Sequence, residues 1–535
     1  MSALRRLTAV VDAGLGRVSM YLLVTASLVL ISTFAVVAAA SGQLPYDPGA
    51  IALSLVVGVV ATAAGTWIGA LVTRSRPHPP SSVITGLILA LILWPGYGQD
   101  LLVLAVAGLA AGISKYLLAW RGRHLLNPVV AGLLVVGLSG LGVSIWWVGS
   151  QALLLVVAVT GLVVLWRTRR LLYGLSFVVP ALALTFVAYT GSGLSLAQAA
   201  TFTFGSSPIV FLGAFMLSEP LTTPPRQWQR ITVGVLVAVI SVLPVLPFVP
   251  TLPVGITPEL ALAVGNVVAF AFGMRHRVVL RLESSRRSGD LLDLTFTPSA
   301  PLRMLPGQYL ELDVPAAGVG DPRGRRRVLS IASDPAGGPV RLVTRIAAVP
   351  GAEPSPVKAA LVALRPGDVL PVTSVGGDFL LPDGDAPLAL VGAGIGVTPF
   401  LAHLDALARG TLAARDLVLV HAVKDVADVL DVVTAPSADI PGGGVRAALP
   451  AVAALPSGVR LVLVLPPGAP RAAVPAGWEV VEGAALTPDV LAAAVPDLAE
   501  RTVLVSGSPV AVAAVTDAAR SAGVRHLRTD VFLGY

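Results

Sequence analysis

The chain has 535 residues, enough for two or three domains. Hydrophobic residues make up 55% of it and charged residues 13%, and the mean hydropathy is +0.83, which excludes an ordinary soluble enzyme. The chain contains no cysteine, so disulfides, thiolate catalysis and cysteine-ligated iron–sulfur clusters are excluded. The net charge of +7 comes without the mixture of aromatic and basic residues typical of a nucleic-acid surface, so we expect no nucleic-acid partner.

The first half of the chain consists mostly of apolar runs. Ten of them lie near residues 18–40, 50–72, 81–94, 100–119, 126–147, 150–166, 171–190, 198–218, 229–249 and 257–274. A membrane-spanning helix needs about 20 residues. We therefore predict an α-helical polytopic membrane domain of about ten helices over residues 1–274, with the lipid bilayer as its surroundings.

Lysine and arginine occur in alternate connections between these runs. They are Arg5, Arg6 and Arg17, then Arg74 and Arg76, then Lys115, Arg121 and Arg123, then Arg167, Arg169 and Arg170, and finally Arg226 and Arg230. Positively charged loops stay on the cytoplasmic side. We therefore predict a multi-pass protein of the cell membrane with both termini in the cytoplasm, where nicotinamide nucleotides are found.

Polar residues interrupt the apolar runs at three places. They are Thr85 in the third run, Asn127 before Pro128 in the fifth, and Glu219, Thr222 and Thr223 at the end of the eighth. Such residues can mark helix boundaries, but broken helices whose ends face a buried ligand give the same pattern. The three stretches resemble, in order and spacing, the flavin-carrying membrane subunits of the Rnf complex and of the sodium-translocating NADH:quinone reductase. The resemblance implies that these residues contact a flavin.

Some members of that family attach FMN covalently to the threonine of a Ser-Gly-Ala-Thr motif. The sequence contains no such motif, and the connection over residues 139–150 has no threonine. We therefore expect a second flavin in the membrane domain, FMN or riboflavin, to be bound without a covalent link.

The second half begins with a segment that alternates apolar and polar residues. Residues 306–314, PGQYLELDV, follow a Pro-Gly turn and predict a strand, and a second strand is expected over 328–332 after an arginine-rich turn. An arginine fork suits phosphate oxygens, and the hydroxyl of Ser330 can hydrogen-bond a ring nitrogen. We predict an antiparallel β-barrel domain over residues 275–385.

The sequence from Arg327 to Ser330 resembles the Arg-x-Tyr-Ser motif of the ferredoxin–NADP reductase family, with Leu329 in place of the aromatic residue. The resemblance implies FAD, contacted by Tyr309, Arg327, Leu329 and Ser330, with Ser330 taking part in catalysis. It also implies that Ser355 and Lys358 hold a flavin phosphate, although a capped surface helix explains those two residues equally well.

Residues 387–400, PLALVGAGIGVTPF, combine a buried strand, a glycine-rich turn and the start of a helix. Glycines let the backbone approach a pyrophosphate, and a helix N-terminus favours its negative charge. Further strands are expected over 417–422, 459–465 and 502–506, which predicts an α/β parallel-sheet domain over 386–535. The segment resembles the nicotinamide-binding part of the same reductases, which implies that NAD(P)H contacts Gly392, Gly394, Gly396, Thr398 and Pro399.

Two further positions follow from this resemblance. Ser506 and Gly507 occupy the family's Cys-Gly-x-Pro position, which places Ser506 beside the nicotinamide as a second residue that takes part in catalysis. Tyr535, the last residue, corresponds to an aromatic residue that stacks on the flavin, but a packed tail fits equally well.

The leading hypothesis is a membrane-bound flavoprotein oxidoreductase. NADH or NADPH gives a hydride to FAD, and electrons pass to a membrane flavin and then to a quinone or an extracytoplasmic acceptor protein. We expect no haem, because only His78 and His124 lie in the membrane half and both are beside basic connections, and we expect no metal site. The alternative is a solute or ion transporter gated by an NAD(P)H-sensing, reductase-like domain.

Overall fold

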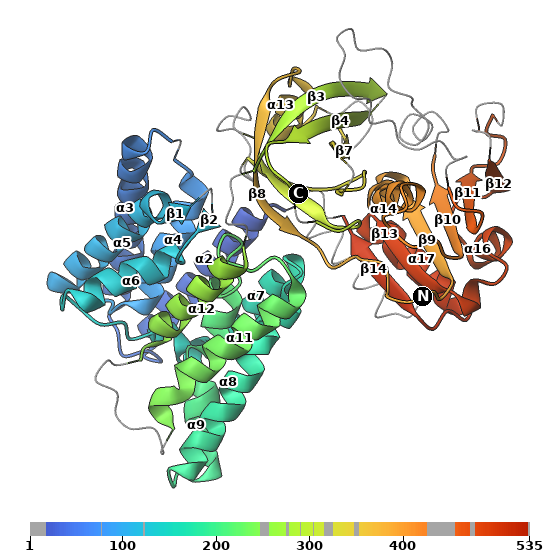
Figure 1. Cartoon of the computed structure of the whole chain (residues 1–535). Helices are drawn as coiled ribbons and strands as arrows, with labels where there is room; N and C mark the ends of the chain where they lie inside the picture. Colours follow the sequence, from blue (N-terminus) through green and yellow to red (C-terminus); the bar gives the residue numbers. More distant parts are fainter. Residues whose placement is uncertain are drawn as a thin grey trace. The chain divides into compact units, whose positions relative to one another are not determined.

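The structure is a computed structural model (Figure 1). It describes residues 18–75, 77–120, 123–246, 256–273, 278–288, 290–302, 304–314, 325–336, 338–346, 353–424, 455–470, 474 and 477–532. The described residues form two compact units, a helical unit over 18–273 and a second unit over 278–532 that contains both large sheets. Each unit is described by itself below.

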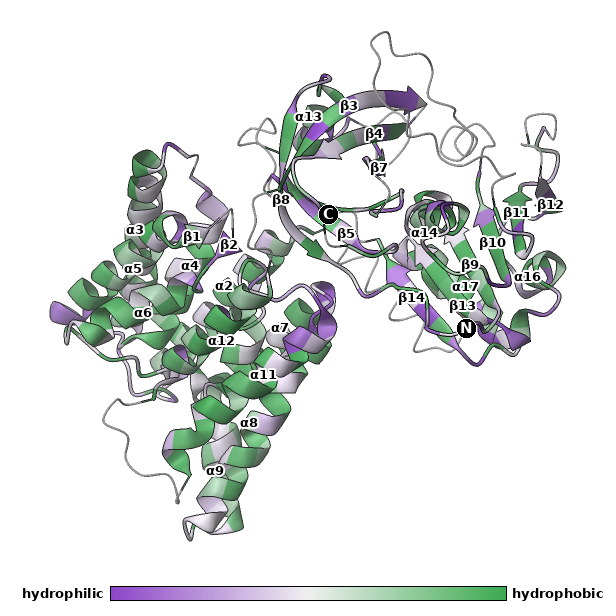
Figure 2. Cartoon of the chain, viewed as in Figure 1, coloured by the Kyte–Doolittle hydropathy of each residue, from purple (hydrophilic) through white to green (hydrophobic). Residues whose placement is uncertain are grey.

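In the described part of the chain, six helical segments are long and apolar enough to cross a membrane. They are α2 (Met20–Ala40), α3 (Pro48–Val72), α5 (Gln99–Leu117), α8 (Leu171–Gly191), the segment Leu196–Met216, and Gln227–Val245, which begins with α11 (Gln227–Val242). The segment Leu196–Met216 contains α9 (Leu196–Gly205), α10 (Ile209–Phe211) and the π-helix η3 (Leu212–Met216). Figure 2 shows that apolar residues predominate throughout the helical unit.

The remaining predicted runs also contain helices, but these are shorter. They are α4 (Pro79–Ile92), α6 (Pro128–Leu138), α7 (Leu154–Arg167) and α12 (Pro258–Phe272), with 14, 11, 14 and 15 residues. At about 1.5 Å per residue, each falls short of a hydrocarbon core about 30 Å thick. The structure therefore supports six candidate spans, and the full set of ten stays a prediction.

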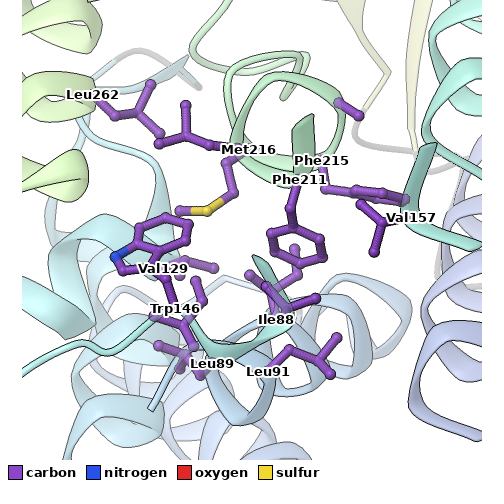
Figure 3. Packing of buried hydrophobic residues seen from close by; sticks show 14 of the residues in the cluster. Ile88, Leu89, Leu91, Val129, Trp146, Val157, Phe211, Phe215, Met216 and Leu262 are labelled. Carbon is purple, nitrogen blue, oxygen red and sulfur yellow. The ribbon is translucent and has the colours of Figure 1, made fainter. Parts of the chain in front are cut away.

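Close helix packing in this unit depends on glycine. A Cβ on Gly58 of α3 would lie 2.6 Å from the carbonyl oxygen of Gly86 in α4, and one on Gly65 would lie 2.3 Å from that of Leu109 in α5. Small residues let membrane helices approach closely. Figure 3 shows the apolar core, in which Trp146 packs beside Met216.

The first large sheet of the second unit is antiparallel. Its strands are β3 (Val278–Ser288), β4 (Leu291–Pro298), β5 (Tyr309–Asp313), β6 (Arg326–Ser330), β7 (Val340–Arg345) and β8 (Val369–Gly376), in the order β6-β5-β8-β3-β4-β7. One isolated bridge, between Ile331 and Leu342, links the two ends of this order. Closure of the sheet into a complete barrel stays a prediction.

The second large sheet is parallel, as the sequence predicts. Its strands are β9 (Leu388–Ala393), β10 (Leu417–Ala422), β11 (Val459–Leu465), β12 (Trp478–Glu482), β13 (Thr502–Gly507) and β14 (Leu527–Val531), in the order β12-β11-β10-β9-β13-β14. The helices α14 (Thr398–Ala408), α16 (Pro488–Ala494) and α17 (Pro509–Ser521) accompany it. The chain runs outward from β9 to β12 and then returns to the other side of β9, so β9 and β13 flank a switch point, where ligands bind in open α/β sheets.

Contacts fix the two sheets of this unit to each other. The backbone N–H of Asp334 donates to Oδ2 of Asp405 at 2.7 Å, and Oγ1 of Thr411 donates to Oδ2 of Asp334 at 2.6 Å. The rings of Phe379 and Phe400 pack with their centroids 5.6 Å apart. Because Asp334 and Asp405 are both buried, this junction is a fixed part of the core.

Candidate functional site

The glycine-rich turn after β9 is packed tightly against the sheet and is open on its outer side. A Cβ on Gly396 would lie 2.2 Å from the carbonyl oxygen of Ser506 and 2.6 Å from Cα of Gly507, so only glycine fits there. Gly394 has φ +55°, and a Cβ on it would meet no atom within 4 Å. A Cβ on Gly392 would lie 3.0 Å from Cα of Val397. The turn can therefore present its backbone to a ligand.

The helix that follows the turn continues from the 3₁₀-helix η6 (Gly394–Val397), and the backbone N–H of Thr398 donates to the carbonyl oxygen of Ile395. Thr398 is buried, and its Oγ1 donates to the carbonyl oxygen of Ile395 at 3.0 Å. Pro399 stands in the first turn of α14 and lacks an N–H where such groups have no partner within the helix. The remaining N–H groups and the helix dipole favour an anion at this end.

Three side chains lie in one row at the carboxyl edge of the parallel sheet. In the strand register His421 and Ser506 both pair with Gly392, and Asp530 pairs with Ser506. Lateral neighbours in a parallel sheet share a face, so the side chains of His421, Ser506 and Asp530 project from the same side. Ser506 is fully buried, and its Oγ has no hydrogen-bond partner within the described structure.

Burial alters the titration of two groups in this row. It lowers the pKa of His421 to about 4, although the hydrogen bond to Gly394 opposes the change. It raises the pKa of Asp530 to about 6. His421 is therefore uncharged at neutral pH, and its Nε2 lies 3.0 Å from the carbonyl oxygen of Gly394. Neither residue is evident as a site residue from the sequence, because only the strand register brings them to Ser506.

Tyr309 and Ser330 lie together on one face of the antiparallel sheet. They are direct partners in the pairing of β5 with β6, and Tyr309 also pairs with Gly376 of β8. A Cβ on Gly376 would lie 2.8 Å from the hydroxyl oxygen of Tyr309, and one on Gly377, which has φ +108°, would lie 3.1 Å from the ring. The two glycines thus leave room for the Tyr309 ring.

Arg327 and Leu329 lie on the opposite face of the same strand pair. They pair with Leu312 and Leu310, which are fully buried. Arg327 is itself only 4% exposed, and its Nη1 donates to the carbonyl oxygen of Arg326 at 2.6 Å. Since Arg327 and Ser330 project from opposite faces, a single ligand can touch both only by crossing the edge of β6.

The remaining predicted residues of the second unit stand apart from this strand pair. Ser355 is the N-cap of the short helix α13 (Pro356–Val362), and its Oγ accepts from the backbone N–H of Lys358 at 3.4 Å. This is the geometry of a capped helix. Gly507 begins the connection to α17, and its carbonyl oxygen accepts from Phe532 at 2.8 Å. Tyr535 lies outside the described residues.

Asn127 connects three elements of the helical unit. Its Oδ1 caps α6 by accepting from the backbone N–H of Val129 at 2.9 Å, and its Nδ2 donates to the carbonyl oxygen of Met216 at 3.2 Å. Its own backbone N–H donates to Oδ1 of Asn266 in α12 at 2.7 Å. Asn127 is 3% exposed, so this polar junction lies inside the unit.

Glu219 lies three residues beyond Met216, at the centre of a second polar group. Its Oε1 is 3.1 Å from Nδ1 of His124, and Oγ1 of Thr222 is 3.4 Å from its Oε2. Oγ1 of Thr223 donates to the backbone carbonyl of Glu219 at 2.5 Å, and Nη2 of Arg123 donates to the carbonyl of Thr223 at 2.8 Å. The segment after η3 is therefore tied to the basic connection before α6.

Thr85 joins this group indirectly. Its Oγ1 donates to the carbonyl oxygen of Ser81 at 2.8 Å, and Nζ of Lys115 donates to the same oxygen at 2.9 Å. Lys115 is 8% exposed and is attracted by the charge of Glu219. The structure thus brings the three predicted stretches together through Ser81, Lys115 and Met216. In the sequence, Lys115 is only one of the loop cations, and nothing marks Asn266 as part of this group.

No group of three or more His, Asp or Glu side chains suited to a metal ion occurs in the part of the chain that the structure describes. The antiparallel sheet, the glycine turn and the row beside it belong to one compact unit. The polar group around Glu219 belongs to the other unit.

Comparison with known proteins gives similarities of fold. No family model matches the chain, and no curated protein matches it. The solved structures similar to its C-terminal part include the cytochrome P450 reductase GcoB of Amycolatopsis, which is 23% identical, with 48% of this chain and 70% of that chain covered and a TM-score of 0.36. The FAD/NAD binding domain of a nitric oxide dioxygenase from Vibrio cholerae is 17% identical, with 48% and 98% covered and a TM-score of 0.36.

A ferredoxin NADP+ reductase from Neisseria gonorrhoeae, whose structure holds FAD and NADP, is 17% identical, with 48% of this chain and 99% of that chain covered and a TM-score of 0.35. Likenesses at this level describe a fold and do not by themselves assign an activity to this chain. The similarity of the first half to flavin-carrying membrane subunits stays a prediction.

Proposed function

We propose that the chain is a membrane-bound NAD(P)H-dependent flavin oxidoreductase of the ferredoxin–NADP reductase type. The observation that carries the proposal is the glycine turn after β9, which is open on its outer side and packed against the buried Ser506. An open left-handed glycine on the path from a buried strand to a helix N-terminus lets a ligand approach the backbone closely. A dinucleotide pyrophosphate is such a ligand.

Several features of the turn support NAD(P)H as the substrate. The turn lies beside the switch point of the parallel sheet, between β9 and β13, where the order of the strands reverses. Thr398 fixes the start of α14 through Ile395, and Gly396 allows the turn to touch β13. The Oγ of Ser506 has no hydrogen-bond partner within the described structure, but it is fully buried, so it would reach the nicotinamide only if the turn shifts when NAD(P)H binds.

The strand pair β5–β6 supports FAD as the resident cofactor. Tyr309 and Ser330 present a ring and a hydroxyl on one face, and Gly376 leaves room for the Tyr309 ring. The hydroxyl of Ser330 would hydrogen-bond a ring nitrogen of the flavin, while Arg327 would meet its phosphates from the other face of β6. Flavin, when bound, accepts a hydride and releases single electrons, and the protein supplies position and electrostatics.

Residues of the first unit would hold the second redox group. A hydrocarbon core about 30 Å thick separates the cytoplasm from an outside acceptor. We propose that a non-covalent FMN or riboflavin lies near Thr85, Asn127 and the segment from Glu219 to Thr223. The short helix α6 begins at Pro128 with Asn127 as its N-cap, and the side chain of Asn127 donates to the carbonyl of Met216, where the π-helix η3 ends, so the ends of two short helical segments meet there. Electrons would then pass to a quinone or an extracytoplasmic acceptor protein.

The proposed activity is tested with the full chain purified in a mild detergent. NADH or NADPH oxidation is followed with ferricyanide as an artificial acceptor, before and after addition of FAD. The proposal requires oxidation that depends on bound flavin and needs no transported solute. Absence of NAD(P)H oxidation in a preparation that retains flavin would contradict the proposal and favour the gated transporter.

A further inference from the structure

The side chain of His421, which belongs to β10, contacts the glycine-rich turn that would bind the nucleotide. It lies near the end of β10, the strand that is hydrogen-bonded directly to β9, and pairs in register with Gly392. The residue is 2% exposed, and its Nε2 is 3.0 Å from the carbonyl oxygen of Gly394. This is a long-range contact, because the two residues are 27 positions apart in the chain.

The contact defines the protonation of the ring. A backbone carbonyl only accepts hydrogen bonds, so Nε2 of His421 must carry the proton and donate it. Nδ1 is then an acceptor, and it has no hydrogen-bond partner among the residues that the structure describes. Among the described residues, the only hydrogen bond of this buried ring is therefore the one that it makes to the turn.

Holding the Gly394 carbonyl also determines where the next amide points. The peptide unit between Gly394 and Ile395 is planar and trans, so its C=O and N–H point in opposite directions. When the carbonyl is directed inward to His421, the N–H of Ile395 is directed outward. Gly394 has φ +55° and begins the 3₁₀-helix η6 (Gly394–Val397), so the backbone hydrogen bonds of that helix and the contact from His421 together orient this peptide.

We propose that His421 is a positioning residue for the pyrophosphate of NAD(P)H. It holds the Gly394–Ile395 peptide so that the amide N–H faces the phosphate oxygens before the nucleotide arrives. The inference rests on the proposed function, since it assumes that the turn binds a dinucleotide. It adds a residue that acts through the backbone and does not touch the ligand.

The chain contains a matched control in His403. This histidine is 1% exposed, and its Nδ1 is 2.8 Å from the carbonyl oxygen of Pro399. It thus resembles His421 in burial and in bonding a backbone carbonyl of the same domain. Its partner, however, is a carbonyl in the first turn of α14. Its ring lies against Gly307, two residues before strand β5 of the antiparallel sheet.

The test uses the full chain in detergent with the variants His421→Gln, His421→Asn and His403→Asn. A glutamine amide can place an N–H where Nε2 lies, whereas an asparagine amide is too short to reach Gly394. We expect His421→Asn to raise KM for NADH or NADPH roughly tenfold, with kcat and flavin content close to those of the unaltered chain. His421→Gln should restore KM to within about threefold, and His403→Asn should leave it unchanged.

Three outcomes would overturn the inference. These are an unchanged KM in both His421 variants, an equal rise in both of them, and an equal rise in His403→Asn, which would indicate general loss of packing. If the unaltered chain holds flavin but oxidises no NAD(P)H, the proposed function itself fails, and this result is distinct from the other three.

Discussion

At the scale of single residues, a substitution at Gly394 is expected to have the largest effect on NAD(P)H oxidation. A valine there would place a branched side chain on the open side of the turn, in the path of the pyrophosphate, and would also strain the backbone at φ +55°. We expect Gly394→Val to abolish NAD(P)H oxidation while flavin content stays near that of the unaltered chain. Stopped-flow reduction of the flavin by NAD(P)H measures this directly.

Gly410 provides the control for that change. It follows the other end of α14, has φ +71°, and also has open space at its Cβ position. Gly410→Val therefore introduces the same kind of strain away from the turn. If both variants lose flavin reduction to the same extent, strain and not pyrophosphate binding explains the loss.

The buried titratable residues of the second unit predict a dependence of stability on pH. Burial lowers the pKa of His403 and of His421 to about 4, below the usual value of 6.5. Between these values the unfolded chain binds more protons, so stability falls as the pH drops from 6.5 to 4. Burial raises the pKa of Asp530 from 3.8 to about 6. Between these values the folded chain binds more protons, so this group increases stability as the pH drops, opposite to the two histidines.

Apparent melting temperatures between pH 7 and pH 4.5 test these signs. The unaltered chain should melt at progressively lower temperature on acidification. His403→Gln should reduce that decline, and Asp530→Asn should make it steeper, because it removes the group that gains stability from protonation. Parallel profiles for all three proteins would show that these side chains do not titrate as their burial requires.

At the scale of elements, strand alternation separates the predicted flavin residues. The sequence predicts the strands and the glycine turn, because alternation and the Pro-Gly and glycine-rich segments are local signals. It does not predict that Arg327 belongs to the strand, because the expected strand begins at residue 328 and β6 begins at Arg326; inside the strand, alternation places Arg327 and Ser330 on opposite faces. Nor does it predict that His421, Ser506 and Asp530 form one row, because register is a non-local property.

The helical elements show the same limit. Each apolar run contains a helix, but hydropathy alone does not reveal that α6 has 11 residues or that η3 is a π-helix. These interruptions depend on tertiary hydrogen bonds, such as the one from Asn127 to the carbonyl of Met216. The polar group around Glu219 is likewise assembled by contacts between segments far apart in the chain.

The opposite faces of β6 lead to a prediction about flavin binding. Arg327→Ala should weaken FAD binding by on the order of 2 kcal/mol, because it removes a charge-assisted contact to phosphate. Arg326→Ala changes the neighbouring arginine, which projects from the other face 4.0 Å from Glu311, and should leave FAD binding nearly unchanged. Titration of the flavin-depleted chains with FAD gives both values. Equal losses would show that the phosphates do not lie on the face of Arg327.

At the scale of the whole molecule, the basic connections predict both termini in the cytoplasm. Reporter fusions after Gly42, Gly191 and Tyr535 test this arrangement. The first two lie in connections without lysine or arginine and should report an outside location, whereas Tyr535 should report the cytoplasm. An outside signal at Tyr535 would separate the nucleotide-binding half from NAD(P)H and contradict the topology.

The proposed function requires that a single chain holds two flavins, one reduced by NAD(P)H and a second in the membrane domain that receives its electrons. The most direct test is to purify the full chain in mild detergent, precipitate it with acid, and measure flavin per chain in the supernatant and in the pellet. We expect two flavins per chain, both released into the supernatant. A single released flavin, with none in the pellet, would contradict it, because no second redox group would then connect the cytoplasmic flavin to an acceptor across the membrane.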